Sequence, residues 1–455
     1  MAEKLLFYST NRKAPEVNFR SALLKGLAPD KGLYMPDQIP QICKNELDSF
    51  ADKEYHEIAF DIIKKYVFEN IADDDLRFIT SDAYTYPVPL EKVYGNKYIM
   101  RLDQGPTASF KDFAARFMGR SINHFLKEEN KKLAILTATS GDTGSAIANA
   151  FYGLDNIRVI VLYPEKEVTD RQRKQMTTLG ENISVISIDG KFDDCQALVK
   201  QAFMDPELDK YNLSSANSIN IGRLVPQIVY YFYAYSRLCK ESPDNKIVFS
   251  VPSGNFGDMM GGVLAMKMGL PVEKFIIASN ENDEFPVLMK TQKYSKIEPS
   301  RNCISSAMNV GHPSNLARLI TLYGGNMDEQ GNIFENPDFD MMRKELFTVS
   351  INDELTRKTI KDTFSQHGTL LEPHGAVGWA GVKHWLSENP EKKDSLIVSL
   401  ETAHPAKFPQ EINNILNIEP ELPESLKGIE NKPEHIFSVN NNYESFKEFL
   451  IKNIN

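Results

Sequence analysis

The chain has 455 residues, 42% hydrophobic and 25% charged, and a formal net charge of -10 at pH 7. This size and composition predict a globular protein of about two to three domains, and the acidic balance argues against nucleic-acid binding. No segment is apolar over the length of a membrane span or resembles a signal peptide, so we expect a cytoplasmic protein. The four cysteines form no CxxC pair, which predicts reduced thiols and no metal site.

The first part of the chain is mixed in pattern and rich in helical periodicity. It ends at the proline-bearing segment 85–102, where two β-rich runs flank Gly95-Asn96 and predict a hairpin. We therefore place a domain boundary near residue 90, with a mixed N-terminal domain over residues 1–90 and the rest of the chain over residues 91–455.

A lysine stands in an unfavourable position directly after this boundary. The segment GPTASFKDFAARF places Lys111 in the first turn of a predicted helix, whose apolar residues recur at three- and four-residue spacing from Phe110 to Ile122. A cation at a helix N-terminus opposes the helix dipole. The position is therefore costly unless the lysine has a chemical use.

From residue 132 onward, predicted strands alternate with predicted helices. The strands cover residues 133–139, 158–164, 183–189, 246–252, 274–279 and 395–401. The helices cover residues 145–153, 169–179, 193–203, 224–238 and 259–268. This alternation predicts an α/β fold with a mostly parallel sheet and helices on both faces. The tail from Pro420 retains apolar residues, and we expect it to pack on the rest of the protein.

Three of the predicted strands lead into chemically unusual loops: TSGDTGS (139–145), SGNFGDMMGG (253–262) and ETAHPAKF (401–408). Ligands of open α/β sheets bind outside the carboxyl ends of the strands, so we expect the three loops to converge. The second loop opens a helix and is suited to bind a phosphate. Its glycine spacing matches neither the nucleoside-triphosphate pattern GxxxxGK[ST] nor the dinucleotide pattern GxGxxG. The alternative to phosphate binding is that the glycines serve only tight packing at the start of the helix. The first loop could bind a carboxylate or be a plain helix start capped by Ser140 or Asp142.

One cofactor, pyridoxal 5'-phosphate, would explain three of these features together. They are a lysine withdrawn from water, a loop suited to bind a phosphate, and a neutral polar residue at the end of a strand. Burial and the helix N-terminus both lower the pKa of a lysine, which favours the free amine that attacks the aldehyde of this cofactor. The unfavourable position of Lys111 would then have a chemical use.

Several motifs, in this order along the chain, carry a resemblance to a known family: GLAPDKGLYMP (26–36), GPTASFKDFAARF, TATSGDTGSA, NSINIGRLVPQ (217–227), VPSGNFGD and TAHPAKFP (402–409). They resemble the threonine synthases, in the tryptophan synthase β-like, fold type II group of pyridoxal-phosphate enzymes, and the longer class with an N-terminal domain. The resemblance implies a two-lobed catalytic domain over residues 91–455, with mostly parallel sheets, helices on both faces and a C-terminal extension. It implies conversion of O-phospho-L-homoserine and water to L-threonine and phosphate by a monomer or homodimer.

The resemblance also implies roles for individual residues. Lys111 matches the Schiff-base lysine, and Thr402 matches the hydroxyl that faces the pyridine nitrogen. The cofactor-phosphate loop corresponds to Gly254, Asn255, Phe256, Gly257 and Asp258. The substrate carboxylate and the ring face correspond to Ser140, Gly141, Asp142 and Thr143. The substrate phosphate corresponds to Asn217, Ser218 and Arg223.

The sequence departs from the family pattern in three places. Lys31 stands where a glycine is expected, and the segment STNRK (9–13) differs from the usual STR. Residues 303–315 match only loosely, so we assign no catalytic role to Cys303 or His312. His374 could point at the cofactor or be satisfied by the backbone.

Other functions remain open at this stage. A related phospholyase would eliminate phosphate from the same substrate and release 2-oxobutanoate and ammonia. A dehydratase acting on serine or threonine would have no use for Arg223, which on propensity alone is a surface arginine. A non-catalytic binding module of the same fold would lack the lysine.

Overall fold

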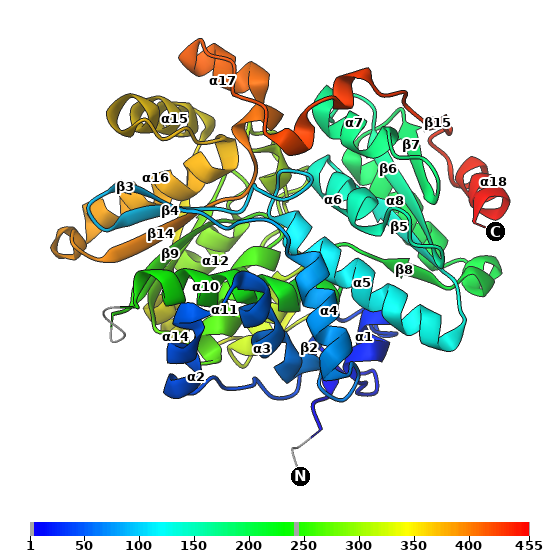
Figure 1. The fold of residues 1–455 in the computed structure, drawn as a ribbon, viewed down its shortest axis with the longest axis horizontal. Coiled ribbons are helices and arrows are strands. Elements are labelled where there is room, and N and C mark those ends of the chain that lie inside the picture. The colour runs from blue at the N-terminus through cyan, green and yellow to red at the C-terminus, as the bar shows by residue number, and fades with distance from the viewer. Residues whose placement is uncertain (1–3, 241–244, 455) are drawn as a thin grey trace.

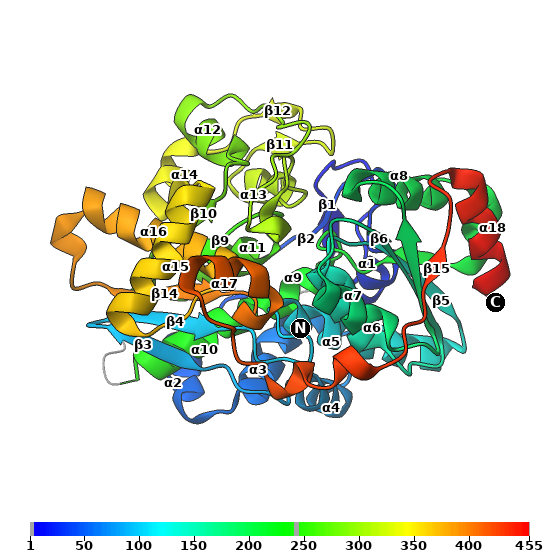
Figure 2. The same cartoon turned by 90° about the horizontal axis from the view of Figure 1, so that it is seen from above.

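The computed structural model describes residues 4–240 and 245–454. Two separate sheets form the centres of two halves of the molecule, and the N-terminal helices lie together along one side of it (Figures 1 and 2). The fold is therefore α/β with two lobes, as expected. No helix among the described residues is both long and apolar enough to cross a membrane.

The first lobe contains a six-stranded sheet in the order β13-β10-β9-β14-β4-β3. Its strands are β3 (Leu90–Tyr94), β4 (Lys97–Arg101), β9 (Ile247–Pro252), β10 (Val272–Ser279), β13 (Leu346–Ser350) and β14 (Leu396–Glu401). All neighbours are parallel except β3 and β4, which pair antiparallel and confirm the predicted hairpin.

The second lobe contains a five-stranded parallel sheet in the order β15-β7-β6-β5-β8. Its strands are β5 (Leu133–Ala138), β6 (Ile157–Pro164), β7 (Ile183–Ile188), β8 (Leu213–Ser215) and β15 (Phe437–Ser438). The C-terminal helix α18 (Tyr443–Asn453) packs against this lobe and buries Phe446 and Leu450, so the prediction of a packed tail is confirmed.

The other helices surround these sheets. They are α1 (Phe19–Lys25), α2 (Lys44–Ser49), α3 (Tyr55–Val67), α4 (Asp73–Ala83), α5 (Lys111–Glu129), α6 (Asp142–Phe151), α7 (Asp170–Thr177), α8 (Phe192–Phe203), α9 (Ile221–Leu224), α10 (Val229–Leu238), α11 (Gly257–Lys267), α12 (Glu284–Thr291), α13 (Leu316–Leu322), α14 (Phe339–Glu345), α15 (Asp353–His367), α16 (Pro373–Glu388) and α17 (Pro409–Leu416). Two small antiparallel pairs complete the fold: β1 (Phe7–Ser9) with β2 (Tyr34–Pro36), and β11 (Asn326–Met327) with β12 (Ile333–Glu335).

The predicted helix over residues 224–238 is wrong as a single element. The chain forms the short helix α9, then a tighter helical turn at Val225–Ile228, and then α10. Pro226 lacks an N–H group and cannot donate the hydrogen bond that a continuous α-helix requires. The interruption separates the segment that carries Arg223 from the long apolar helix.

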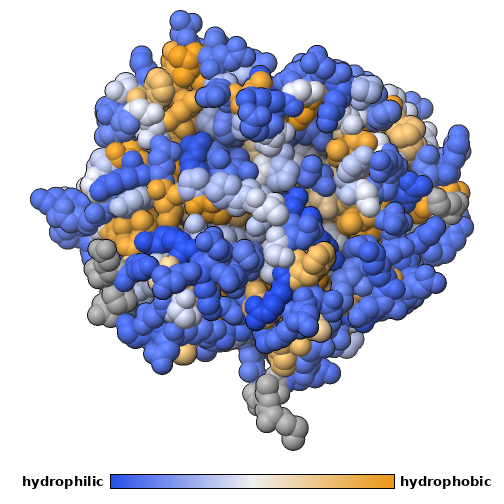
Figure 3. Space-filling model, in the orientation of Figure 1, coloured by the Kyte–Doolittle hydropathy of each residue, from blue (hydrophilic) through white to orange (hydrophobic). Residues whose placement is uncertain are grey.

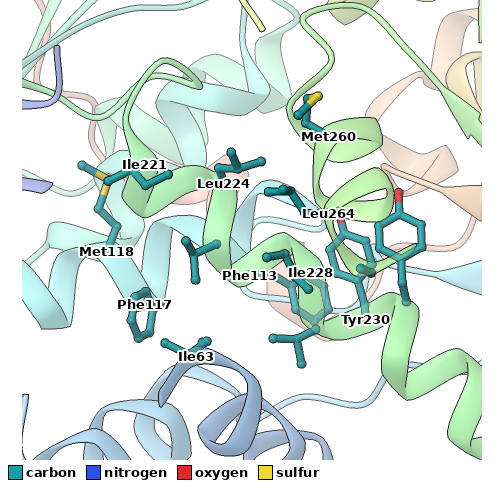
Figure 4. Close-up of a cluster of buried hydrophobic side chains, with 14 of the residues drawn as sticks. Ile63, Phe113, Phe117, Met118, Ile221, Leu224, Ile228, Tyr230, Met260 and Leu264 are labelled. Carbon is teal, nitrogen blue, oxygen red and sulfur yellow. The ribbon is translucent and has the colours of Figure 1, made fainter. Parts of the chain in front are cut away.

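The aromatic stripe of α5 is buried, as predicted. Figure 4 shows the cluster that it joins, in which side chains of α3, α5, α9, α10 and α11 meet. The labelled members are Ile63, Phe113, Phe117, Met118, Ile221, Leu224, Ile228, Tyr230, Met260 and Leu264. The face of the molecule in Figure 3 differs in character, because hydrophobic residues there form small groups among hydrophilic ones.

The N-terminal segment supports the short helix α9 directly. Asn220 caps α9 and donates a hydrogen bond from its amide to Leu23 O at 2.9 Å. A Cβ at Gly222 would lie 2.2 Å from Leu23 Cδ1, so α1 and α9 are in close contact. The division of the chain near residue 90 stays a proposal.

Lys31 occupies a left-handed conformation, with φ of 67°, and is exposed. This conformation is favourable for glycine and costs a residue with a Cβ about 1–2 kcal/mol, which explains why a glycine is expected there. We expect Lys31→Gly to stabilise the protein by about 0.5–1 kcal/mol, because the gain in the folded state exceeds the added freedom of the unfolded chain.

Urea unfolding of the purified protein measures this difference. Lys31→Ala is the matched control, since it removes the side chain but keeps the Cβ, and it should give no gain. Equal stabilisation by both variants would show that the lysine side chain, and not the backbone conformation, is the source of the cost.

Candidate active site

Lys111 is the first residue of α5, and its amine is largely buried, with 13% of the side chain exposed. The turn before it is fixed by Asp112, whose carboxylate accepts hydrogen bonds from Thr107 N at 2.8 Å and from Thr107 Oγ1 at 2.6 Å. Ala108 in this turn has φ of 53°, which is costly for a residue with a Cβ. The backbone is therefore constrained where the lysine leaves it.

The end of β14 is hydrogen bonded to the same turn. Phe110 N donates to Thr402 O at 2.9 Å, and His404 N donates to Ala108 O at 3.0 Å. Thr402 itself is buried. These bonds bring the start of α5 and the carboxyl end of the six-stranded sheet together, with Thr402 bonded to Phe110, the residue before Lys111.

The TSGDTGS loop enters α6 through a strained glycine. Gly141 has φ of 131°, and a Cβ there would lie 2.5 Å from the side chain of Gln172. Gly141 occupies the N-cap position, and Asp142 is the first helical residue. The interpretation of this loop as a helix start capped by Ser140 or Asp142 is therefore wrong. Thr139 Oγ1 instead accepts a hydrogen bond from Gly141 N at 2.9 Å.

Asp142 and Lys407 form a buried ion pair next to Lys111. Lys407 Nζ lies 2.6 Å from Asp142 Oδ1, and neither side chain is more than 3% exposed. Gln172 Nε2 donates to the same oxygen at 2.9 Å, whereas Asp142 Oδ2 lies 4.0 Å from Lys111 Nζ. Burial alone would raise the pKa of Asp142, but the two lysines hold this pKa well below its ordinary value. The carboxylate is therefore ionised.

The pKa of the Lys111 amine is lowered from its ordinary value. Burial is the largest cause. Asp142 opposes this effect, and the positive charges of Lys407 and Arg223 add to it. A lowered pKa increases the neutral fraction of the amine, which is the form that attacks a carbonyl or accepts a proton.

The SGNFGD loop presents free backbone donors at the end of β9. Within the part of the chain that the structure describes, the N–H groups of Gly254, Asn255 and Phe256 have no hydrogen-bond acceptor. Phe256 has φ of 62° and turns the chain into α11, whose N-terminus adds positive potential. Free N–H groups at a helix N-terminus are suited to bind a phosphate.

Two glycines of this loop have different surroundings. A Cβ at Gly254 would lie 2.8 Å from Met308 Cα, so the loop packs tightly on the segment around Met308. A Cβ at Gly257 would meet the protein only at ordinary distances, the nearest being 3.5 Å to Gln227 Nε2. The protein therefore leaves room for a Cβ at Gly257, and the side chains of Gln227 and Asn315 lie nearby.

The polar side chains of the loop point into the protein. The carboxyl group of Asp258 accepts hydrogen bonds from Tyr230 and from Tyr231 Oη at 2.7 Å, and burial raises its pKa to about 6. Asn255 Oδ1 accepts a hydrogen bond from Ser314 N at 3.0 Å. These two side chains brace the loop, so any phosphate contact from Asp258 would come from its backbone, whereas the side-chain amide of Asn255 keeps its donor group.

Arg223 is buried, with only 4% of the residue exposed, so its interpretation as a surface arginine is wrong. Its Nη1 donates to Ala216 O at 2.7 Å, and its Nε has no partner among the described residues. No carboxylate of the described structure lies within ion-pair distance of Arg223. Burial lowers its pKa to about 10, and the more distant Asp112 opposes this effect. A buried cation without a direct ion pair is suited to bind an anion.

The remaining predicted residues are less deeply buried. Asn217, Ser218, Ser140 and Thr143 are half-buried. The buried Oδ1 atom of Asn217 has no partner among the described residues. Ser218 O accepts a hydrogen bond from Arg318 Nη1 at 3.2 Å, so its backbone is committed to the protein.

Sequence reasoning missed three polar residues that this arrangement uses: Lys407, Gln172 and Arg318. Lys407 belongs to the TAHPAKFP motif, and its position between the apolar residues Ala406 and Phe408 was an available signal of burial. Gln172 and Arg318 carry no comparable local signal, because their partners lie far away in the sequence.

The histidines and cysteine that drew attention in the sequence are satisfied elsewhere. His374 Nε2 accepts a hydrogen bond from Ala307 N at 3.0 Å, and its Nδ1 bonds to Glu372. This favours the interpretation in which His374 is satisfied within the protein. His312 bonds to Tyr294, and burial raises the pKa of the Cys303 thiol, which disfavours the thiolate that a metal would need.

The geometry fits pyridoxal phosphate. Free N–H groups at the start of α11 suit its phosphate, and a buried amine with a lowered pKa suits its aldehyde. The buried hydroxyl-bearing residue Thr402 lies beside the turn that carries Lys111.

Comparison with known proteins gives the same cofactor. Residues 86–401 match the family described as pyridoxal-phosphate dependent enzyme. Residues 6–84 match the threonine synthase N terminus, and residues 375–450 match the C-terminal region of threonine synthase.

Individual relatives cover almost the whole chain. Threonine synthase of Buchnera aphidicola subsp. Schizaphis graminum is 38% identical over 98% of this chain and 99% of the relative. Threonine synthase of Escherichia coli is 38% identical over 92% of this chain and 93% of the relative. The crystal structure of pyridoxal-phosphate-bound threonine synthase from Brucella melitensis matches with a TM-score of 0.92 and 33% identity over 99% of both chains. The chain therefore belongs to the threonine synthase family of pyridoxal-phosphate-dependent enzymes.

Proposed function

We propose that this enzyme converts O-phospho-L-homoserine and water to L-threonine and phosphate. The observation that carries the proposal is Arg223, a buried arginine without a direct ion-pair partner among the described residues, whose charge acts on Lys111. A phosphate monoester needs such a cation in a chain with a net charge of -10. Unphosphorylated serine or threonine would leave Arg223 without a function.

Pyridoxal phosphate, when bound, supplies the electron sink that makes the Cα and Cβ protons of the substrate acidic. Lys111 is the group that would accept these protons, because its lowered pKa favours the neutral amine. Arg223, with Asn217 and Ser218 near it in the sequence, would bind the phosphate that leaves from Cγ. Ser140 and Thr143 are half-buried and would bind the substrate carboxylate.

The remaining assignments are part of the same proposal. Gly254 to Asp258 would hold the cofactor phosphate, and Thr402 would face the pyridine nitrogen. A cytoplasmic location and a monomeric or homodimeric enzyme are also proposed.

Product analysis tests the proposed reaction. Purified protein incubated with O-phospho-L-homoserine should release phosphate and threonine in equal amounts, as measured by amino-acid chromatography and a phosphate assay. Release of 2-oxobutanoate and ammonia in place of threonine would identify the phospholyase. Borohydride reduction followed by peptide mapping should place the cofactor on Lys111, and a label on another lysine would refute that assignment.

The phosphate cradle can be tested at Gly257. We expect Gly257→Val to fold normally, since a Cβ meets the protein only at ordinary distances. It should weaken cofactor binding about ten- to a hundredfold, which corresponds to losing a hydrogen bond to a charged group. Fluorescence titration of the cofactor-free protein measures the Kd.

Gly254→Ala is the contrasting variant, because its Cβ would lie 2.8 Å from Met308 Cα. It should lower the thermal stability of the cofactor-free protein, which Gly257→Val should not. Full cofactor occupancy in Gly257→Val would refute the proposal that the loop from Gly254 to Asp258 holds the cofactor phosphate.

The role of Arg223 can be tested by substitution. Arg223→Ala removes a desolvated charged contact, which typically costs roughly 2 to 5 kcal/mol. This corresponds to a loss of about tens to thousands fold in kcat/KM for O-phospho-L-homoserine. Arg223→Lys should recover only part of it, because lysine keeps the charge but not the planar fork.

Arg237→Met is a control for the removal of a part-buried arginine. The guanidinium of Arg237 donates to the carbonyl oxygens of Phe50 and Ala51, so this variant should lower stability and leave kcat/KM close to the wild-type value. A near-wild-type kcat/KM in Arg223→Ala would show that Arg223 does not bind the substrate phosphate.

A further inference from the structure

Lys407 is a fully buried lysine to which the family resemblance assigns no role. Its Nζ lies 2.6 Å from Asp142 Oδ1 and donates to Thr107 O at 2.9 Å. Burial of an ammonium group is costly unless it is paired and hydrogen bonded. Both partners are close to Lys111, since Thr107 lies in the turn before it and Asp142 faces its amine.

The distances show how the charge of Asp142 is shared. Oδ1 receives Lys407 at 2.6 Å and Gln172 at 2.9 Å, whereas Oδ2 stays 4.0 Å from Lys111 Nζ, beyond hydrogen-bonding distance. The Asp142 carboxylate is therefore hydrogen bonded to Lys407 and not to Lys111. Without Lys407, the same buried carboxylate would have Lys111 as its only nearby cation among the described side chains within ion-pair distance.

We propose that Lys407 is a positioning residue that pairs with the Asp142 carboxylate at the start of α6 and so keeps this carboxylate from hydrogen bonding to the Lys111 amine. The inference rests on the proposed function of Lys111 as the cofactor-binding amine. It concerns the electrostatic environment of that amine and not the identity of the product.

Charged groups from several elements face Lys111. They are Asp142 of α6, Lys407, Arg223 of α9, Glu372 at the start of α16 and Asp258 of α11. The positive charge of Lys407 lowers the pKa of Lys111, and the negative charge of Asp142 raises it. Removing Lys407 therefore acts twice in the same direction, since a repulsive cation is lost and Asp142 is released toward Lys111.

The protonation of Lys111 can be measured without turnover. Full-length protein stripped of cofactor is trace-labelled with acetic anhydride across a pH series, and mass spectrometry of the Lys111 peptide gives the midpoint at which the amine becomes reactive. The variants are Lys407→Met, Lys407→Arg, Asp142→Asn and the double variant Lys407→Met with Asp142→Asn.

We expect Lys407→Met to move the midpoint upward by about one pH unit, within the range of shifts that a nearby opposite charge produces. Labelling near neutral pH should then fall about tenfold. Asp142→Asn should move the midpoint downward, because the charge of Lys407 is then uncompensated. The double variant should lie near the wild type, and Lys407→Arg should resemble the wild type because the charge is kept.

A purely structural role of Lys407 gives a different result. Thermal stability would fall in Lys407→Met, and the midpoint of Lys111 would stay at the wild-type value, which overturns the proposal. If Lys407→Met does not fold, the comparison of Asp142→Asn with the double variant isolates the same charge. Identical midpoints in those two proteins also overturn the proposal.

The two hypotheses fail in different ways. A borohydride label on another lysine would refute the role of Lys111 itself. An unchanged midpoint with the label on Lys111 would refute only the role of Lys407.

Discussion

The burial of three cations close to one another is the constraint on which the proposed active site depends. Lys111, Lys407 and Arg223 are withdrawn from water in one region, and the acidic groups that act on them are Asp142, Asp112, Asp258 and Glu372. Asp258 does not balance them at lower pH, since burial raises its pKa to about 6. Lys111 and Arg223 have no hydrogen-bonded carboxylate in the described structure and therefore favour anions, and both the cofactor and the proposed substrate carry a phosphate. The chain as a whole has a net charge of -10, so this preference is local.

The N-terminal segment is part of the same arrangement. Arg223 stands on a helix of only four residues, too short to be stable by itself. This helix is held by Asn220, which caps it and bonds to Leu23 O, and by the close packing of Gly222 on Leu23. Arg318 adds a second link, because its guanidinium donates to Tyr34 O of β2 and to Ile219 O. Residues far from the cofactor loops thereby fix the position of the buried arginine.

The sequence predicted those features that local chemistry determines. The hairpin at Gly95-Asn96, the alternation of strands and helices and the buried stripe of α5 follow from turn residues and periodicity. The expected glycine at residue 31 also corresponds to a backbone requirement, since φ is positive there. Pro226 was an available local signal that the predicted helix over 224–238 would be interrupted.

Features that depend on tertiary contacts were not predictable in this way. Lys407 follows a strand of one sheet, whereas Asp142 follows a strand of the other, so their pairing exists only after both lobes have folded. The burial of Arg223 likewise results from α1 and the surrounding helices, and the sequence around it indicates only a polar turn. The resemblance of the motifs identified the loops, whereas the partners of each side chain depend on the three-dimensional structure.

The ion pair between Lys407 and Asp142 also has a mechanical consequence. Lys407 follows β14 of the six-stranded sheet, and Asp142 follows β5 of the five-stranded sheet. Their contact therefore ties one lobe to the other at a buried point, where separating the charges would be expensive. Any rotation of the lobes that preserves this contact must pivot close to it. The amine of Lys111, which we propose to bind the cofactor, would then lie near the axis of the motion, where displacements are smallest, while the outer edges of the lobes move farthest.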